Sequence, residues 1–374
     1  MIVKKSVLFV CSYPDSILNF RKELLYNFHR KGYIVNILLP KNELKPETLT
    51  LLKSTPFKIY LCYLDRCNIN VLNDIKYLLK IFNIIYKLRP KYVFSYTIKP
   101  VLYSGLLSHF FPSISFHSLI TGLGYTFSNR KNLIFKFISS FYRLSLCGND
   151  HIFFQNIDDL SLFHRLDLVS FNKSSVVNGS GINLSYYNYV KLEDTFSVSF
   201  VMISRFIRQK GLIEYLKAVS IVHEIYPDVT FSLVGWYDHG PDSISSDELQ
   251  YHVSNSNVDL IGRVEDPRPI LKKHSVIVLP SYREGVPRSV LEALAIGRAV
   301  ITTDVPGCKE TVLNGENGYL IKSKSVKELS NAMIKLIENP NLVSSMGCRS
   351  RQIACEKFDV HKVNKNILNT ISSF

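Results

Sequence analysis

Three cations gather in the stretch MISRFIRQKGLIEYL, at Arg205, Arg208 and Lys210. A short apolar run ends at Ile203 and a helical pattern begins near Leu212, which places the cations on a strand-to-helix turn. Guanidinium and ammonium groups at such a turn attract phosphate. The alternative is that they are ordinary loop charges in water.

Two carboxylates, Glu284 and Glu292, flank a second turn in VIVLPSYREGVPRSVLEALAIGRAVITT, residues 276–303. This segment predicts a strand, a loop, a helix and a strand, with Pro287 in the first helical turn and Gly297 at the helix C-terminal cap. The loop would lie at the carboxyl end of a parallel strand and at a helix N-terminus, where α/β sheets bind anionic ligands. The two carboxylates would then bracket one ligand, unless they are merely a loop charge and a solvated helix residue.

A nucleotide sugar suits this arrangement. One carboxylate would accept hydrogen bonds from sugar hydroxyls and the other from ribose hydroxyls, while backbone N–H groups near Gly285 would meet phosphate. Gly235, which ends FSLVG, and the pair Gly262 and Arg263, which ends VDLIGR, mark two more strand ends at the same edge. Each glycine alone is more often a turn residue, but together they outline a rim.

Strands and helices alternate twice along the chain, which predicts parallel, doubly wound sheets. In the first series, strands are expected at 6–10, 33–40, 57–63, 92–96 and 114–120, and helices at 19–32, 71–89 and 100–111. In the second, strands are expected at 198–203, 229–235, 258–262, 276–280, 299–303 and 318–322, and helices at 212–225, 267–274, 287–297 and from about Val326 onward.

The predicted fold class is therefore α/β, with two Rossmann-like doubly wound domains facing across a cleft. A chain of 374 residues is longer than one hydrophobic core usually serves. Periodicity is lost in VVNGSGINLSYYNYVKLEDTF, which predicts a hinge. The expected division is an N-terminal acceptor-binding domain at 1–182, a hinge at 183–195, a nucleotide-sugar-binding domain at 196–355, and a last helix at 356–374 that crosses back to the N-terminal domain.

The net charge is +14, and it is unevenly distributed. Residues 1–190 hold 23 Lys and Arg against 10 Asp and Glu, an excess of 13, whereas the rest hold 22 against 21. Such asymmetry predicts that the first half meets something anionic, namely a phosphorylated acceptor, a membrane surface or nucleic acid, unless it serves solubility alone. Seven scattered cysteines form no C-x-x-C pair, which is typical of reduced cytosolic thiols.

No stretch approaches the roughly 20 apolar residues that span a bilayer, so the protein is expected to be soluble or membrane-peripheral. The apolar run SVLFVC is too short for a signal peptide and predicts a first strand. The stretch RKNLIFKFISSFYRLSL, residues 130–146, mixes basic and aromatic residues and could lie on an anionic membrane. The alternative is a helix with its apolar face in the N-terminal core.

In combination, SRFIRQKG, LVG, IGR and EGVPRSVLE, followed by GRAVITTDVPGCKE and NGENGYL, resemble the donor-binding half of glycosyltransferase family 4. These are retaining enzymes of the GT-B fold, and the resemblance is strong over about residues 198–325. It implies that Arg205 and Lys210 hold the donor diphosphate, Glu284 the sugar hydroxyls and Glu292 the ribose, with Arg263 near the nucleobase. The residues that would complete the phosphate site are Gly285, Val286, Pro287 and Ser289.

In the first half, SYTIKPVLYSGLL and LITGLGYTF are similar to bacterial enzymes that extend polyprenyl-diphosphate-linked O-antigen, capsule or protein-glycan precursors. The similarity implies that Asn19, Arg21 and Lys99 approach the acceptor diphosphate, unless they are surface polar residues. The similarity also implies that Thr121 and the backbone of Gly122 and Gly124 form the pocket wall.

Two departures from the family pattern concern this half. The loop CSYPDSILNFR lacks the paired glycines of many members, which puts donor contacts from this side in doubt. Thr121 stands where many members carry His before Gly, and His117 is interpreted as a core histidine.

The resemblance implies transfer, with retention, of a hexose or N-acetylhexosamine from a UDP- or GDP-sugar to a lipid-linked oligosaccharide, in O-antigen or capsule synthesis. No cofactor and no metal is expected, since no D-x-D sequence is present. The expected partners are the nucleotide sugar, the lipid-linked acceptor and the anionic inner face of the cytoplasmic membrane, with no nucleic acid, so that the protein is expected to be cytoplasmic and membrane-peripheral.

Three alternatives remain open. The same fold could act on a soluble sugar or sugar phosphate. A basic nucleic-acid-binding protein is also compatible with the isoelectric point of 9.3, although no recognition motif is present. A dinucleotide-dependent oxidoreductase would share Rossmann-like domains, but no G-x-G-x-x-G opens the first helix of either half.

Overall fold

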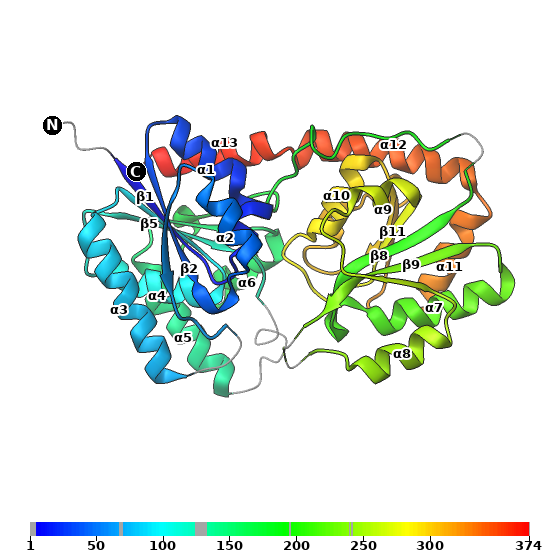
Figure 1. The fold of residues 1–374 in the computed structure, drawn as a ribbon, viewed down its shortest axis with the longest axis horizontal. Coiled ribbons are helices and arrows are strands. Elements are labelled where there is room, and N and C mark those ends of the chain that lie inside the picture. The colour runs from blue at the N-terminus through cyan, green and yellow to red at the C-terminus, as the bar shows by residue number, and fades with distance from the viewer. Residues whose placement is uncertain are drawn as a thin grey trace. The chain divides into compact units, whose positions relative to one another are not determined.

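A computed structural model describes residues 5–66, 70–123, 133–193, 196–238, 240 and 242–373, with the backbone alone at 133–137. The chain forms two compact units (Figure 1). Unit 1 comprises Met1–Ser180 and His361–Phe374, and unit 2 comprises Gly181–Val360. The chain therefore passes between the units twice, at 180/181 and at 360/361.

Unit 1 is built on a parallel sheet in the order β3-β2-β1-β4-β5-β6-β7. Its strands are β1 (Ser6–Val10), β2 (Ile34–Pro40), β3 (Lys58–Cys62), β4 (Tyr92–Tyr96), β5 (Ser115–Ile120), β6 (His151–Phe154) and β7 (Ser174–Val176). Its helices are α1 (Lys22–Arg30), α2 (Pro46–Lys53), α3 (Val71–Leu88), α4 (Ile98–Ser108), α5 (Leu133–Cys147), α6 (Ile157–Arg165) and α13 (Val360–Ser372), with a π-helical turn η1 (Ile17–Arg21) before α1.

Both faces of this sheet are covered, which explains why its central strands are continuous apolar runs. Along β1, Val7 and Phe9 point into a core that α1 and α13 complete, whereas Leu8 and Val10 point into a core that α3 completes. The last helix therefore belongs to the core of unit 1, although it follows all of unit 2 in the sequence.

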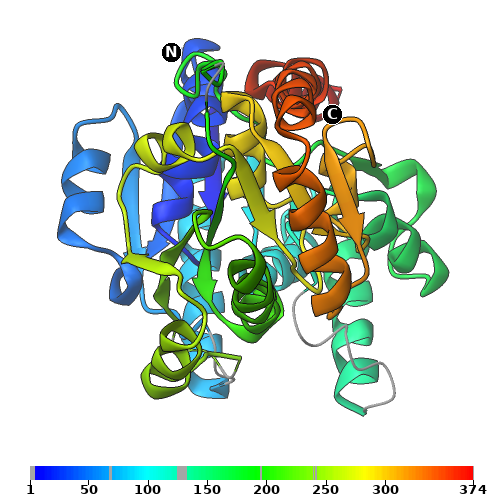
Figure 2. The same cartoon turned by 90° about the vertical axis from the view of Figure 1, so that its right-hand side faces the viewer.

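Unit 2 is built on a second parallel sheet, in the order β10-β9-β8-β11-β12-β13. Its strands are β8 (Ser199–Phe206), β9 (Thr230–Tyr237), β10 (Asp259–Gly262), β11 (Val276–Leu279), β12 (Ala299–Thr303) and β13 (Gly318–Ile321). Its helices are α7 (Leu212–Ile225), α8 (Ser246–Ser254), α9 (Arg268–Lys273), α10 (Arg288–Ile296), α11 (Val326–Ile337) and α12 (Pro340–Lys357), with short turns η5 (Arg208–Lys210) and η6 (Lys309–Thr311). Helices α7 and α11 lie side by side (Figure 2).

The segment expected to be a hinge is packed on unit 2. The Val190 backbone N–H donates to the Ile296 carbonyl at 3.0 Å. The buried Arg298 guanidinium donates to the Val190 carbonyl at 2.7 Å and to the Leu271 carbonyl at 2.8 Å. Residues 183–193 are thus part of unit 2. The chain changes unit just before them, at 180/181, and again near its C-terminal end, at 360/361.

The basic aromatic segment at 130–146 coincides largely with α5, but Arg130 and Lys131 and the side chains of Phe135, Lys136 and Phe137 lie outside the described part of the structure. Among the described side chains, Tyr142 is buried in the core of unit 1 and Phe141 packs against it. Arg143 donates to the backbone carbonyls of Leu166 and Asp167. The described half of this helix therefore turns its aromatic residues inward.

His117 is a core histidine, as the sequence interpretation holds. It lies on β5 with 1% of its surface exposed, and its Nε2 is 3.0 Å from the Ser115 Oγ. Burial, with a smaller effect from the charge of His151, lowers the pKa of His117 to about 3. The imidazole is therefore neutral in the folded protein at physiological pH.

We expect this histidine to make unit 1 less stable in acid. Because the folded pKa lies below the unfolded value of about 6.5, its stabilisation is complete above that pH and is lost as pH falls toward 3, by up to about 1.4 kcal/mol per pH unit. Urea unfolding at a series of pH values measures this slope. His117→Gln should flatten it, and His29→Gln, at an exposed histidine on α1, should leave it unchanged. An equal slope in both variants would contradict the assignment.

Candidate active site

The sheet of unit 2 has its topological switch point between β8 and β11, because the chain leaves β8 toward β9 on one side and returns at β11 on the other. Open α/β sheets bind ligands outside the carboxyl ends of the strands at such a point. Arg205 lies near the end of β8, Lys210 ends the turn η5 that follows, and Glu284 lies on the loop after β11. The three residues predicted to be catalytic therefore lie at the one edge position where this topology favours a ligand.

Lys210 and Glu284 form an ion pair between the two loops, with the lysine Nζ in contact with the glutamate Oε1. The Ser281 hydroxyl donates to the same Oε1 at 2.8 Å. Only 18% of the lysine side chain and 12% of the glutamate side chain is exposed. The Lys210 ammonium and the Glu284 carboxylate are thus partly buried and in direct contact.

Close backbone packing holds these two loops in register. The Tyr282 backbone N–H donates to the Gln209 carbonyl at 2.8 Å. Gly211 has a φ of +70°, and a Cβ built on it would lie 2.1 Å from the Pro280 carbonyl oxygen. Only glycine fits there, since a side chain would both strain the backbone and separate the loop that carries Lys210 from the loop after β11.

A third segment supports Glu284 from the far side. The Glu284 backbone N–H donates to the Pro306 carbonyl at 3.0 Å. Gly307 has a φ of +85°, and a Cβ there would lie 2.3 Å from the Glu284 carbonyl oxygen. The turn after β12 therefore packs against the Glu284 backbone and fixes the position from which the Glu284 side chain extends.

The other two cations differ in their surroundings. The Arg205 guanidinium pairs with Asp238, which follows β9, and 37% of its side chain is exposed. Arg208 NH2 lies 2.5 Å from the Glu248 carboxylate on α8, with half of the side chain in solvent. Arg208 is thus directed toward α8. Asp238 has no motif around it, so only the structure reveals it as the partner of Arg205.

The start of α10 forms the remaining wall of this edge. Helix α10 begins at Arg288, one residue later than predicted, so that Pro287 is its N-cap and Ser289 its second residue. No side chain caps this N-terminus. The first amide N–H groups of α10 therefore point out of the N-terminal end of the helix, as in helix starts that bind anions.

Glu292 lies in a cluster of its own on α10. Its Oε1 accepts hydrogen bonds from the Tyr187 hydroxyl at 2.8 Å and from Arg288 Nε at 3.0 Å. Arg288 NH1 also donates to the Gly181 carbonyl at 2.5 Å. Burial and the neighbouring Glu292 carboxylate raise the pKa of Tyr187. Glu284 and Glu292 thus each have their own cation, so a ligand that spans them would meet two separate ion pairs.

Two of the predicted rim residues, Gly235 and Arg263, make close contacts in unit 2. A Cβ on Gly235 would lie 1.9 Å from the Ser204 carbonyl oxygen, so glycine is required there by the packing of β9 on β8. The Arg263 guanidinium stacks on the Trp236 ring, 5.3 Å from its centroid. Trp236 is the penultimate residue of β9 and Arg263 directly follows β10, so the pair lies at the carboxyl edge of the sheet.

The candidate acceptor residues all belong to unit 1 and follow strands at the carboxyl edge of its sheet. Asn19 is exposed on η1, whereas Arg21 is 2% exposed with its guanidinium 5.3 Å from the Tyr96 ring centroid. Lys99 Nζ lies 2.7 Å from the Asp74 carboxylate. The remaining two candidates, Thr121 and Gly122, directly follow β5, and Gly124 lies outside the described residues.

A feature that sequence reasoning missed lies at the switch point of this sheet, between β1 and β4. Thr97 has a φ of +71°, which a β-branched residue rarely adopts. Its Oγ1 accepts hydrogen bonds from the Ser12 hydroxyl at 2.8 Å and from the Ser12 backbone N–H at 3.2 Å. Strained backbone of this kind is concentrated at functional sites, and the sequence carries no motif for it.

No group of three or more His, Cys, Asp or Glu side chains among the described residues is placed to hold a metal ion. None of the helices that the structure describes is both long enough and apolar enough to cross a bilayer.

Solved structures share this two-unit architecture. The structure of Alr3699/HepE from Anabaena in complex with UDP superposes with a TM-score of 0.77 over 99% of this chain and 100% of that one, at 16% sequence identity. With two doubly wound units, each with a parallel sheet, the chain has the fold of the GT-B glycosyltransferases.

The sequence relatives of this chain are glycosyltransferases. Residues 197–339, most of unit 2, match the family described as glycosyl transferases group 1. The N,N'-diacetylbacillosaminyl-diphospho-undecaprenol alpha-1,3-N-acetylgalactosaminyltransferase of Campylobacter jejuni is 27% identical over 91% of this chain and 92% of its own length. The UDP-Gal:alpha-D-GlcNAc-diphosphoundecaprenol alpha-1,3-galactosyltransferase of Escherichia coli is 24% identical over 76% of each chain. The chain is a glycosyltransferase that uses a nucleotide sugar.

Proposed function

We propose that this protein transfers a hexose or N-acetylhexosamine from a UDP-sugar to a polyprenyl-diphosphate-linked oligosaccharide, with retention of anomeric configuration, in the synthesis of an O-antigen or capsule. The observation that carries the donor half is the Lys210–Glu284 pair at the switch point of unit 2, with Arg205 and the uncapped start of α10. The acceptor half rests on the two relatives, whose names specify undecaprenyl-diphosphate sugars.

In this proposal the donor diphosphate replaces the Glu284 carboxylate as the partner of Lys210. The lysine and Arg205 then stabilise the negative charge that grows on the leaving nucleoside diphosphate, together with the first amides of α10. Glu284, released from the lysine, accepts hydrogen bonds from sugar hydroxyls. The Glu292 cluster holds the ribose, and the Arg263–Trp236 stack supports the base.

The acceptor hydroxyl attacks the anomeric carbon on the face from which the diphosphate departs. The bond to the leaving oxygen breaks as the new glycosidic bond forms, and a donor phosphate oxygen takes the hydroxyl proton. Gly285, Val286, Pro287 and Ser289 line the phosphate site. In unit 1, Asn19, Arg21, Lys99, Thr121 and Gly122 approach the acceptor at the sheet edge beside Ser12 and Thr97.

The proposal includes no metal cofactor, since ammonium, guanidinium and helix-start amides supply the positive charge that the leaving diphosphate requires. Transfer is therefore expected to proceed at an unchanged rate, within about twofold, after treatment with excess EDTA. A loss of activity that added Mg²⁺ or Mn²⁺ restores would contradict this part of the proposal. The measurement is the initial rate of nucleoside diphosphate release.

A panel of UDP- and GDP-sugars, each offered with a polyprenyl-diphosphate-linked sugar or with a free sugar or sugar phosphate, tests the function. We expect one UDP-sugar to be consumed rapidly and only with the lipid-linked acceptor. The anomeric configuration of the product, read by NMR, tests retention. Turnover only with a soluble acceptor would show that the proposed lipid-linked acceptor is wrong. If none of the nucleotide sugars in the panel supported turnover, the donor assignment would be refuted.

The proposed acceptor is a membrane lipid, so we further propose that the protein works in the cytoplasm, peripherally bound to the inner face of the cytoplasmic membrane. The excess of 13 positive charges within residues 1–190 supports attraction to anionic lipids.

A further inference from the structure

Helix α3 carries an apolar stripe on its outer face, in addition to the apolar face that it buries in unit 1. Leu72, Ile75, Leu79 and Tyr86 recur at helical spacing, and 71% of Leu72 and 54% of Leu79 is exposed. On the inner face, Tyr77, Ile81 and Ile85 are buried. A surface helix normally has one apolar face, and a second, exposed one is typical of a binding surface.

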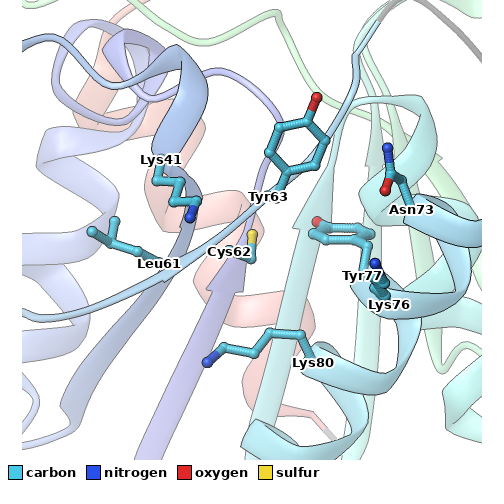
Figure 3. Close-up of a pocket in the computed structure, with 8 residues that line it drawn as sticks. All are labelled: Lys41, Leu61, Cys62, Tyr63, Asn73, Lys76, Tyr77 and Lys80. Atoms are coloured by element: carbon cyan, nitrogen blue, oxygen red, sulfur yellow. The ribbon is translucent and has the colours of Figure 1, made fainter.

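Lysines border this stripe on one side. Lys76 and Lys80 lie on α3, and Lys41 lies directly after β2, and all three line a hollow of about 390 Å³ that also includes Leu61 and Tyr63 (Figure 3). Figure 3 shows the lysines entering the hollow from two sides, Lys41 from the β2 side and the other two from the helix. A volume of this size holds a phosphate group and attached glycerol, given that a liquid water occupies about 30 Å³.

The charged residues that line the hollow are all positive. Asp74 is the only acidic residue within α3, and it is buried and paired with Lys99 at 2.7 Å. Within the described residues, Lys41, Lys76 and Lys80 have no ion-pair partner. At the C-terminal end of the stripe the Arg89 guanidinium stacks on the Tyr86 ring, 4.9 Å from its centroid. Exposed aliphatic residues, lysines beside them and a terminal Tyr–Arg pair form the pattern of a helix that lies in a membrane interface.

We propose that the outer face of α3 docks on an anionic phospholipid bilayer, with Leu72, Ile75 and Leu79 in the interface and lipid phosphates in the hollow of Lys41, Lys76 and Lys80. This inference rests on the proposed function for its purpose, which is to bring unit 1 to a lipid-linked acceptor. Surface and ligand match in charge, because three cations without acidic partners face a phosphodiester that carries one negative charge. In the segment 130–146, by contrast, the described aromatic residues turn inward.

Flotation of the purified full-length protein with vesicles tests the surface without any donor or acceptor. We expect binding to vesicles of phosphatidylcholine and phosphatidylglycerol, weak binding to phosphatidylcholine alone, and loss of binding in high salt. Lys76→Glu with Lys80→Glu should weaken partition to anionic vesicles by at least about 30-fold, because each lysine near such a surface contributes about fivefold. Leu72→Ser with Leu79→Ser should weaken it at every salt concentration.

The matched control is Lys22→Glu with Lys53→Glu, two exposed lysines on α1 and α2 that change the net charge equally. We expect less than a threefold effect from this pair. Equal loss in both pairs would show unspecific attraction and overturn the proposal, as would wild-type binding by the α3 variants. Thermal unfolding of each variant, expected to match the wild type, shows that it is folded.

A transfer assay separates this inference from the proposed function. The α3 variants should retain transfer to a detergent-dispersed acceptor and lose it with the same acceptor in anionic vesicles. If the wild type floats as expected but transfers to no lipid-linked acceptor, the proposed function fails and the docking surface stands. If it transfers in both settings and the variants do too, the docking surface fails.

Discussion

Lys210→Ala is expected to lower kcat for sugar transfer by about 10²- to 10³-fold, the usual effect of removing one group that stabilises developing charge. In the structure this ammonium contacts Glu284, and in the proposed complex it contacts the leaving diphosphate. Its contribution grows as the glycosidic bond breaks, so the loss should fall mainly on kcat. The affinity for UDP, measured by calorimetry, should fall much less.

The control for this variant is Lys217→Ala, at an exposed lysine on α7 in the same unit. We expect it to keep kcat within twofold of the wild type. Thermal unfolding should change little in either variant, because the Ser281 hydroxyl still donates to the Glu284 carboxylate when Lys210 is removed. If Lys210→Ala kept kcat within threefold of the wild type, the lysine would not stabilise the transition state.

Glu284→Gln is expected to lower kcat/KM by about 10- to 100-fold, since a hydrogen bond to a charged acceptor contributes about 1.5–3 kcal/mol. Glutamine keeps the shape of the side chain and one acceptor oxygen but neither accepts as strongly nor pairs with Lys210. The loss should depend on the sugar. With a donor that lacks the hydroxyl bound by Glu284, wild type and variant should differ by less than threefold, because neither makes the contact.

Glu316→Gln is the matched control, because its carboxylate pairs with Arg349 at 3.0 Å on the surface of the same unit. It should leave kcat/KM unchanged with every donor. If Glu284→Gln lost the same factor with all deoxy-sugar donors as with the full sugar, the carboxylate would act through the position of Lys210 and would not bind the sugar.

Much of the fold follows from local pattern. The central strands of both sheets, such as β1, β8 and β11, are short runs of mainly apolar residues that are buried on both faces, and such runs can be recognised without knowledge of their neighbours. The elements that were not anticipated are short or polar, such as α8, which begins SDELQY and buries only Leu249. A single buried side chain produces no hydrophobic periodicity that could be recognised in the sequence.

The candidate site could be predicted from the sequence for a related reason. In a parallel sheet every strand ends at the same edge, so residues that follow β8 and β11 gather there once those strands are neighbours. The cations at 205–210 and the carboxylate at 284 could therefore be grouped from their positions after strands. Their actual pairing was not predictable: Glu284 joins Lys210, while Glu292 joins Tyr187 and Arg288.

The amino-acid sequence alone determined that the chain has two doubly wound halves and that positive charge is concentrated in the first, and it predicts that the second half binds a phosphate-bearing donor. These properties depend on composition and on spacing over one or two elements. Tertiary structure decided which side chains meet, as with Asp238 and Arg205, which lie 33 positions apart.

Tertiary structure also decided which apolar residues remain exposed. The sequence of α3 is apolar on more than one face, and only packing shows that Tyr77 and Ile81 enter the core while Leu72 and Leu79 remain in solvent. The physical reason is that burial and pairing depend on the neighbours that distant segments supply. The local sequence gives only the tendency of each residue to be buried or paired.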